Sequence, residues 1–183
     1  MLSRLRRENT VFLMIDIQER LLPSISGAEE IVQNSVRLVK AAETMALPLL
    51  WTEQYPKGIG PTVKEISSVL PAGASPFEKT AFSCCDEPGF MEKVRTFGRP
   101  SIVIFGIETH ICILSTVMDL LKEGYGVVAV ADACGSRNVR NHDIALRAVQ
   151  SRGALVVPVE TVVYQLLGVS GTPEFKTLLP LFK

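Results

Sequence analysis

Cys112 stands where a protein chain can make a thiol reactive. A β-rich apolar run at residues 101–105 meets Gly106, and an apolar stretch with helical spacing then extends to residue 121. At the N-terminus of a helix, unpaired backbone N–H groups and the positive end of the helix dipole favour a thiolate and can hold a developing oxyanion. Cys112 is therefore a candidate nucleophile, and its plainer alternative is a small buried apolar side chain.

Two charged residues, Asp16 and Lys79, are predicted at the ends of other strands. Asp16 follows the continuous apolar run 11–15, and Lys79 ends a short strand that begins near residue 75. Taken singly, the Asp16 carboxylate could cap a loop and the Lys79 side chain could be solvated. Together at one cleft, Asp16 could accept the thiol proton and return it to a leaving group, while Lys79 stabilises both anions. This set suits attack on an amide or imide carbonyl.

Further pocket residues are predicted from their positions alone. Backbone N–H groups around Glu108 and Cys112 could hold the oxyanion of a tetrahedral intermediate. Ile107 lies in the same turn. The side chains of Gln18, Phe82 and Glu108 are expected to line the substrate pocket, because each lies within a few residues of a candidate catalytic group.

The two histidines offer a competing Cys–His site. His110 precedes Cys112 by two positions, a spacing that directs helical side chains to different faces, so His110 would be a poor base for this thiol. His142 opens a predicted helix and could line the same cleft, although a capping or surface role is the plainer expectation.

Metal and dinucleotide sites are not indicated. The four cysteines, at positions 84, 85, 112 and 134, show no metal-ligand spacing and are expected to be free thiols in a reducing compartment. A strained disulfide between the adjacent Cys84 and Cys85 is the alternative. The Gly58-Ile59-Gly60 run neither follows a strand directly nor opens a helix, as a dinucleotide loop would. No metal and no cofactor are therefore expected.

Strand-like and helix-like patterns alternate along the chain, which predicts an α/β fold. A parallel sheet with helices on both faces, a three-layer α/β/α sandwich with strand order 3-2-1-4-5-6, accommodates such units. In that order the first and fourth strands meet at the switch point, where ligands bind beyond the strand ends. The expected strands are 11–15, 49–52, 75–79, 102–105, 127–131 and 155–157, and the expected helices are 28–45, 63–69, 86–97, 110–123, 141–152, 161–167 and 173–181.

The composition of the chain argues against a multidomain protein, a nucleic-acid-binding protein and a membrane protein. A chain of 183 residues, 47% of them hydrophobic, is expected to form one domain, 1–183. Lysine plus arginine and aspartate plus glutamate both number 19, so no electrostatic footprint for nucleic acid or an anionic membrane is present. No apolar run reaches the roughly 18 residues that a membrane span needs. The basic start, 1–7, lacks a secretory apolar core, which favours the cytosol over a short organelle presequence.

Three ordered runs resemble motifs of the isochorismatase-like cysteine hydrolases: LMIDIQE at 13–19, KTAFS at 79–83 and GIETHIC at 106–112. The resemblance spans nearly the whole chain. It implies the family's three-layer fold, a catalytic triad of Asp16, Lys79 and Cys112, and a cis peptide bond at Ile107–Glu108. The loop TEQYPKG at 52–58 resembles the subgroup named only for its isochorismatase domain, whose substrates are generally unassigned.

Departures from other subgroups narrow the expected reaction. Nicotinamidases of this superfamily bind a metal through Asp-x-His…His after the second strand, where this chain has Thr52-Glu53-Gln54-Tyr55. True isochorismatases cleave an enol ether and need no cysteine. The resemblance thus favours metal-free hydrolysis of a small amide or imide C–N bond, with an idle scaffold and vinyl-ether hydrolysis as alternatives. It also implies a homo-oligomer, in which 161–167 and 175–182 would supply an interface or else pack on the sheet.

Overall fold

Continuous apolar runs become the central strands of a six-stranded parallel sheet. The computed structural model describes residues 4–183, and its strand order, β3-β2-β1-β4-β5-β6, is the predicted one. Every residue of β1 and β4 is buried, as expected of strands covered on both faces. The strands are β1 (Thr10–Ile15), β2 (Leu49–Gln54), β3 (Phe77–Lys79), β4 (Ser101–Ile107), β5 (Gly126–Gly135) and β6 (Leu155–Val157).

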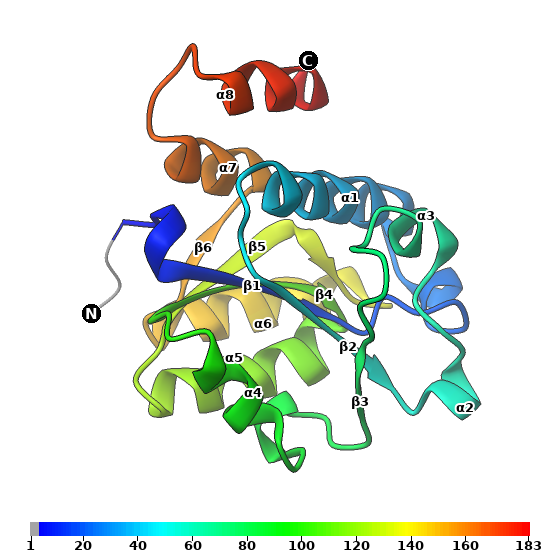
Figure 1. The fold of residues 1–183 in the computed structure, drawn as a ribbon. Coiled ribbons are helices and arrows are strands. Elements are labelled where there is room, and N and C mark those ends of the chain that lie inside the picture. The colour runs from blue at the N-terminus through cyan, green and yellow to red at the C-terminus, as the bar shows by residue number, and fades with distance from the viewer. Residues whose placement is uncertain (1–3) are drawn as a thin grey trace.

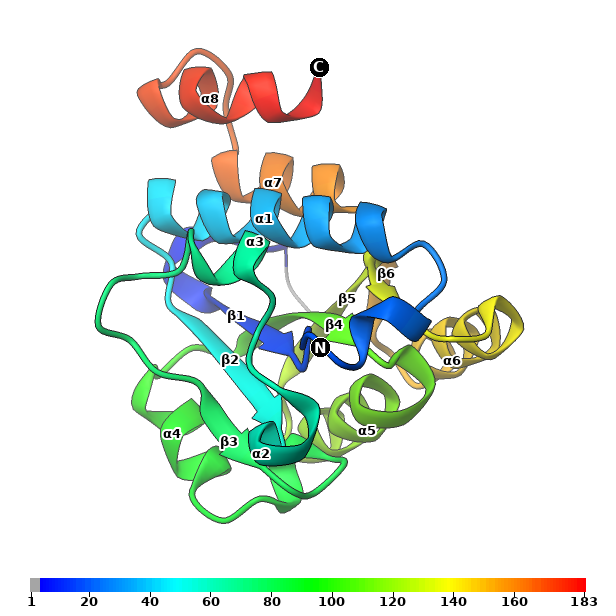
Figure 2. The ribbon, with the colours of Figure 1, turned by 90° about the vertical axis from the view of Figure 1, so that its right-hand side faces the viewer.

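Helices cover both faces of the sheet, so the three-layer prediction is confirmed. In Figures 1 and 2, α1, α3 and α7 lie above the sheet, α4, α5 and α6 lie below it, and α8 forms an outer layer over α7. The helices are α1 (Ala28–Thr44), α2 (Pro56–Ile59), α3 (Lys64–Ser67), α4 (Phe90–Thr96), α5 (Leu114–Lys122), α6 (Val139–Ser151), α7 (Val159–Leu167) and α8 (Pro173–Leu178). Among the described residues, no helix has the length and apolar character of a membrane span.

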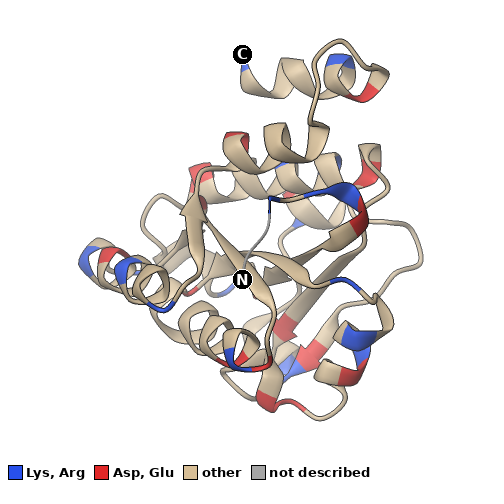
Figure 3. Cartoon of the chain, turned by 90° about the vertical axis from the view of Figure 1, so that its left-hand side faces the viewer, with Lys and Arg blue, Asp and Glu red and all other residues tan. Residues whose placement is uncertain are grey.

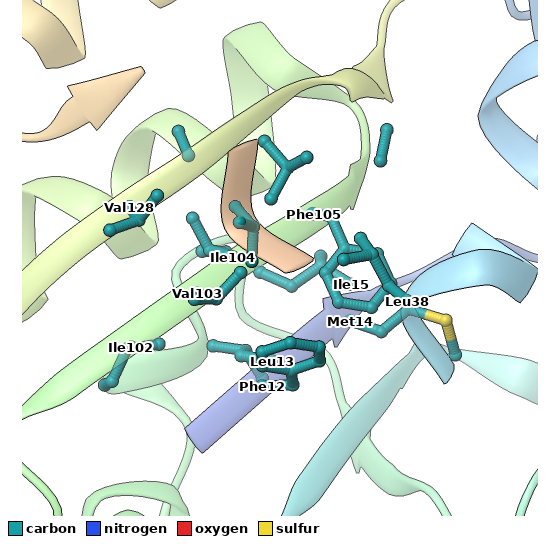
Figure 4. Close-up of a cluster of buried hydrophobic side chains, with 14 of the residues drawn as sticks. Phe12, Leu13, Met14, Ile15, Leu38, Ile102, Val103, Ile104, Phe105 and Val128 are labelled. Atoms are coloured by element: carbon teal, nitrogen blue, oxygen red, sulfur yellow. The ribbon is translucent and has the colours of Figure 1, made fainter. Parts of the chain in front are cut away.

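The hydrophobic core is centred on β1 and β4 (Figure 4). Side chains of both strands pack with Leu38 of α1 and Val128 of β5, all of them fully buried or nearly so. The rings of Phe12 and Phe105 meet edge to face, with centroids 6.2 Å apart. Burial of this kind stabilises by about 25 cal/mol for each Å² of apolar surface removed from water. The core therefore anchors the two strands that lead to Asp16 and Cys112.

The terminal helices pack against the rest of the chain. Val162, Val163 and Leu166 of α7 are buried in the core, and both α7 and α8 contact α1. The ring of Tyr164 meets that of Phe175 edge to face at 6.2 Å. The α7 helix therefore packs against β5 of the sheet, as one of the two expectations held, whereas α8 packs on α1.

Two element boundaries near the site differ from the predicted ones. The helix expected from 110 begins as a π-helical turn, η4 (Thr109–Ile113), that continues into α5. The helix expected from 86 begins instead at Phe90, after Gly89 in a left-handed conformation. The reason is that Glu87 does not cap a helix: its Oε2 accepts hydrogen bonds from the backbone N–H groups of Thr80 and Ala81.

The fifth strand is longer than its apolar pattern predicts. It was expected to end at residue 131, but it runs to Gly135, and Cys134 and Gly135 pair with Gly106 and Ile107 of β4 after a register shift. The extension joins the end of β5 to the turn that carries the candidate nucleophile.

Candidate active site

Asp16, Lys79 and Cys112 meet at the carboxyl end of the sheet because their strands are close neighbours. Ile15 at the end of β1 is paired with Thr52 of β2 on one side and with Gly106 of β4 on the other. Asp16 then adopts a left-handed conformation, φ 53°, a region in which Asp is more tolerated than most residues. Its side chain is fully buried.

Lys79 forms a buried ion pair with Asp16. Its Nζ lies 2.7 Å from Asp16 Oδ2, and neither side chain is exposed. The ammonium also donates to Gln54 Oε1 at 2.5 Å and to the carbonyl oxygen of Ala81 at 3.1 Å. Burial by itself lowers the pKa of Lys79, but the charge of Asp16 and the thiols nearby raise that pKa overall. Lys79 is therefore a fixed cation at the site.

The Cys112 thiol lies beside this ion pair, with its Sγ 3.7 Å from Lys79 Nζ. Burial first, and then the charge of Asp16 and a hydrogen bond to it, raise the pKa of Cys112 to about 12, although Lys79 acts in the opposite direction. The expectation that the helix end would lower the pKa of Cys112 is therefore wrong, because loss of water and the carboxylate outweigh it. At neutral pH the proton stays on sulfur, with a carboxylate in place to receive it.

The turn that leads to Cys112, which we call the elbow (residues 106–112), has a tightly specified backbone. A Cβ at Gly106, φ 125°, would lie only 2.0 Å from the carbonyl oxygen of Ile15, so glycine is required there. The Ile107–Glu108 peptide bond is cis, as the resemblance implies. The Glu108 carbonyl accepts hydrogen bonds from Ile111 and Ile113 N–H at 3.1 and 3.2 Å.

The Glu108 side chain is held by an arginine. Arg137, just after β5, donates its backbone N–H at 2.9 Å, its Nε at 3.1 Å and its Nη2 at 2.5 Å to this carboxylate. Burial alone raises the pKa of Glu108, but the hydrogen bonds and charge of Arg137 lower it overall. Glu108 was expected to line the pocket, and the structure shows its carboxylate engaged with Arg137.

The other three residues expected at the pocket, Gln18, Phe82 and Ile107, differ in their surroundings. Gln18 is fully buried, and its side-chain amide bonds the backbone of Gln54 and of Gly60, which fastens β2 to the loop that carries α2. Phe82 is 64% exposed, whereas Ile107 is completely buried.

Two residues not predicted as site residues, Thr52 and Gln54, bind the charged groups of the site. Thr52 Oγ1 donates to Asp16 Oδ1 at 2.6 Å, and Gln54 holds Lys79 while its Nε2 donates to Thr80 O at 2.7 Å. Residues two apart on a strand share a face. The signal that could have found them is this pair of polar side chains at alternate positions in a mostly buried strand.

The histidines bind hydroxyl groups around the elbow. His142 Nδ1 lies 2.9 Å from Thr109 Oγ1, and His110 Nδ1 lies 2.9 Å from Ser136 Oγ. Burial lowers the pKa of His142, although Asp143 partly opposes this. The hydrogen bond between His142 and Thr109 thus links α6 to η4.

The cysteines are four free thiols, so no disulfide joins Cys84 to Cys85. Cys84 is completely buried and Cys85 is half-buried. Residues 4–183 contain no group of His, Cys, Asp or Glu side chains that could hold a metal ion.

Two hollows lie near the triad. One, of about 340 Å³, is lined by Lys79, Thr80 and the α2 segment, with Lys57, Glu78 and Glu87 as its charged neighbours. The other, of about 240 Å³, lies beside the elbow and is lined by residues that include Ser136 and His142. Ligand pockets in proteins commonly span about 300 to 1,000 Å³, so the hollow beside Lys79 falls at the lower end of that range and the one beside the elbow falls below it.

Comparison with known proteins shows the family. Residues 10–161 match the isochorismatase domain family, so the chain belongs to the isochorismatase-like hydrolase family. Isochorismatase domain-containing protein 2A of Mus musculus is 36% identical over 185 residues, covering 100% of this chain and 86% of that protein.

Solved structures share the fold. The MAR1 ribonuclease of Caenorhabditis elegans has a TM-score of 0.92 and 34% identity, covering 98% of this chain and 92% of that chain. YcaC from Pseudomonas aeruginosa, solved with hexane-2,5-diol and covalent acrylamide, has a TM-score of 0.90 and 24% identity, covering 99% and 92%.

Proposed function

We propose that this protein hydrolyses a small amide- or imide-type C–N bond with Cys112 as the nucleophile. The observation that carries the proposal is the buried contact among three groups: Lys79 Nζ lies 2.7 Å from Asp16 Oδ2 and 3.7 Å from Cys112 Sγ. A nucleophile, a base and a fixed cation in one cleft are the parts that covalent acyl transfer needs.

In the first half of the reaction, Asp16 takes the Cys112 proton as sulfur attacks the carbonyl carbon. The carbonyl oxygen then carries a negative charge, and Lys79 stabilises the negative charge developing at the site. Backbone N–H groups of the elbow would hold this oxyanion, and the amide of Cys112 lies between two amides that already bind the Glu108 carbonyl. Loss of one such donor raises the barrier by about 3 kcal/mol in known acyl-transfer sites.

In the second half, the C–N bond breaks and Asp16 returns its proton to the departing nitrogen. This step leaves a thioester between Cys112 and the acyl group. Water then attacks the thioester carbon while Asp16 accepts a proton, and the thiol is regenerated as the carboxylic acid leaves. Thr52 and Gln54 hold Asp16 and Lys79 in place throughout. No cofactor takes part in these steps.

The experiment is a turnover screen of small amides, imides and vinyl ethers, with Cys112→Ala as the control. Turnover of an amide that is lost in Cys112→Ala supports the proposal. Vinyl-ether turnover that survives in Cys112→Ala would favour the enol-ether alternative instead.

A catalytically idle scaffold is the alternative from a different class. Mass spectrometry after brief treatment with a thiol electrophile separates the two, because an activated Cys112 should react faster than Cys84 and Cys134. Labelling of Cys112 that is no faster, and that does not change when Asp16 or Lys79 is replaced, would favour the scaffold.

RNA cleavage, the activity by which the Caenorhabditis elegans relative is described, has less support here. Cys112 is only 7% exposed, and Figure 3 shows basic and acidic positions interspersed along the ribbon. An RNA arm in the screen tests this directly.

Assembly and location are part of the same proposal. We propose a homo-oligomer that acts in the cytosol, where four free thiols would stay reduced. Multi-angle light scattering tests the first statement, since a mass of 20.0 kDa would show a monomer, and cell fractionation tests the second.

A further inference from the structure

Both cations of the site are engaged within the chain: Lys79 contacts a carboxylate, an amide oxygen and a backbone carbonyl, and Arg137 contacts a carboxylate. Lys79 has three N–H donors, and its Nζ has three oxygen partners, on Asp16, Gln54 and Ala81. Its donor capacity is therefore used within the chain. An anionic group on a substrate would have to displace one of these partners.

The second cation, Arg137, pairs with Glu108, while its own side chain stays 61% exposed. Its Nε, its Nη2 and its backbone N–H all donate to that carboxylate, which is 5% exposed. A planar guanidinium pairs with one carboxylate through this fork of donors. Glu108 of the elbow and Arg137 thus form an ion pair, which we call the Arg137–Glu108 clamp. Many sites for anionic substrates instead have an arginine that is not paired with a carboxylate.

The surroundings of the site supply no excess of positive charge. The hollow beside Lys79 is lined by two lysines, Lys57 and Lys79, and by two carboxylates, Glu78 and Glu87. The hollow beside the elbow is lined by Glu30 and Asp132, and within its described lining no lysine or arginine is present. Asp16 itself lies close enough to Cys112 to influence its charge.

We propose that the active site selects substrates that carry no negative charge. Neutral carboxamides, ureas and imides fit this chemistry, whereas carboxylates, phosphate esters and dicarboxylates such as isochorismate do not. An anion would lose its water, find each cation already paired, and meet the field of Asp16. The inference rests on the proposed function, because it concerns the substrate of the same Cys112 site.

Two alkylating agents of nearly equal size, iodoacetamide and iodoacetate, test this charge selectivity without knowledge of the substrate. In each reaction the Cys112 sulfur forms a bond to the CH₂ carbon, iodide leaves, and the thiol proton is released. The ratio of the two rates at Cys112, read by peptide mass spectrometry, is divided by the ratio for N-acetylcysteine. We expect the normalised ratio to exceed 10, and a value of 1 or below would overturn the inference.

Variants of the Arg137–Glu108 clamp provide matched controls. Glu108→Gln frees the guanidinium and should lower the normalised ratio, whereas Arg137→Gln leaves an unpaired carboxylate and should raise it. The double variant, which removes both charges, should stay near the wild-type ratio. The reverse order, or a ratio that is the same in all four proteins, would contradict the role of the clamp. Circular dichroism checks that each variant is folded.

The same data separate this inference from the proposed function. If Cys112 reacts quickly and depends on Asp16 and Lys79, yet shows no preference for the neutral reagent, only the charge selectivity fails. If Cys112 reacts with neither reagent faster than the half-buried Cys85, the nucleophile proposal fails and the substrate inference fails with it.

Discussion

Breaking the buried ion pair between Lys79 and Asp16 from one side should cost more stability than removing both charges. Both side chains are fully buried and the two atoms lie 2.7 Å apart. Lys79→Met leaves the Asp16 carboxylate in the core with the Thr52 hydroxyl and the Cys112 thiol as its remaining side-chain donors. Removing one partner of a buried pair typically costs about 3 to 5 kcal/mol. In a protein of this length that loss corresponds to a fall in Tm of about 6 to 20 °C.

A double-mutant cycle measures this coupling. Urea unfolding of the wild type, Asp16→Asn, Lys79→Met and the double variant gives four free energies of unfolding. The double variant should be more stable than Lys79→Met, with a coupling energy of at least about 2 kcal/mol, since no charge is left buried. The double variant should also be inactive, so a gain in folding stability would not be accompanied by a gain in activity. Costs that add to within about 0.5 kcal/mol would refute the reasoning, because independent sites behave in that way.

Three further predictions concern the groups around the ion pair. Gly106→Ala should cost about 3 kcal/mol or more in unfolding free energy, because it combines a positive φ with a clash against the Ile15 carbonyl. Gly98→Ala, with φ 61° and open space around it, is the control for strain alone, and an equal cost for both variants would show that the clash is absent. Thr52→Val should cost about 2 kcal/mol in thermal or urea unfolding, because Asp16 Oδ1 loses its hydrogen bond. Thr52→Ser keeps the hydroxyl and should cost less than Thr52→Val, and the opposite order would be inconsistent with this role. Because the pKa of Cys112 is raised to about 12, its alkylation rate should still be rising at pH 10 as the thiolate fraction grows. A plateau by about pH 9, near the pKa of an ordinary thiol, would show that the raised pKa is wrong.

The sheet and the meeting of Asp16, Lys79 and Cys112 could be predicted from the sequence because they follow from the order of strands. The fully apolar runs before Asp16 and Cys112 mark central parallel strands, and right-handed crossovers then fix which strand ends meet. Lys79 was harder to place, because a lysine at the end of a short strand is usually solvated. Its position depends on the register in which Gln54 of β2 lies opposite Lys79 of β3.

Features that depend on tertiary contacts could not be predicted. Thr52 and Gln54 are ordinary strand residues until Asp16 and Lys79 face them. The pKa of Cys112 was expected in the wrong direction, because a helix end is visible in a sequence whereas burial beside a carboxylate is not. The pairing of Glu108 with Arg137 could not be predicted either, since the two residues are 29 positions apart in the chain.

The proposed reaction depends on a covalent acyl intermediate between Cys112 and a neutral amide. The most direct measurement is the mass of the Cys112 peptide after acid quenching of the protein during turnover of an amide found in the screen. We expect an adduct equal in mass to the acyl part of the substrate, released by hydroxylamine and absent from Asp16→Asn and Cys112→Ala. Hydrolysis of the same amide by Cys112→Ala at the wild-type rate would contradict the proposed reaction.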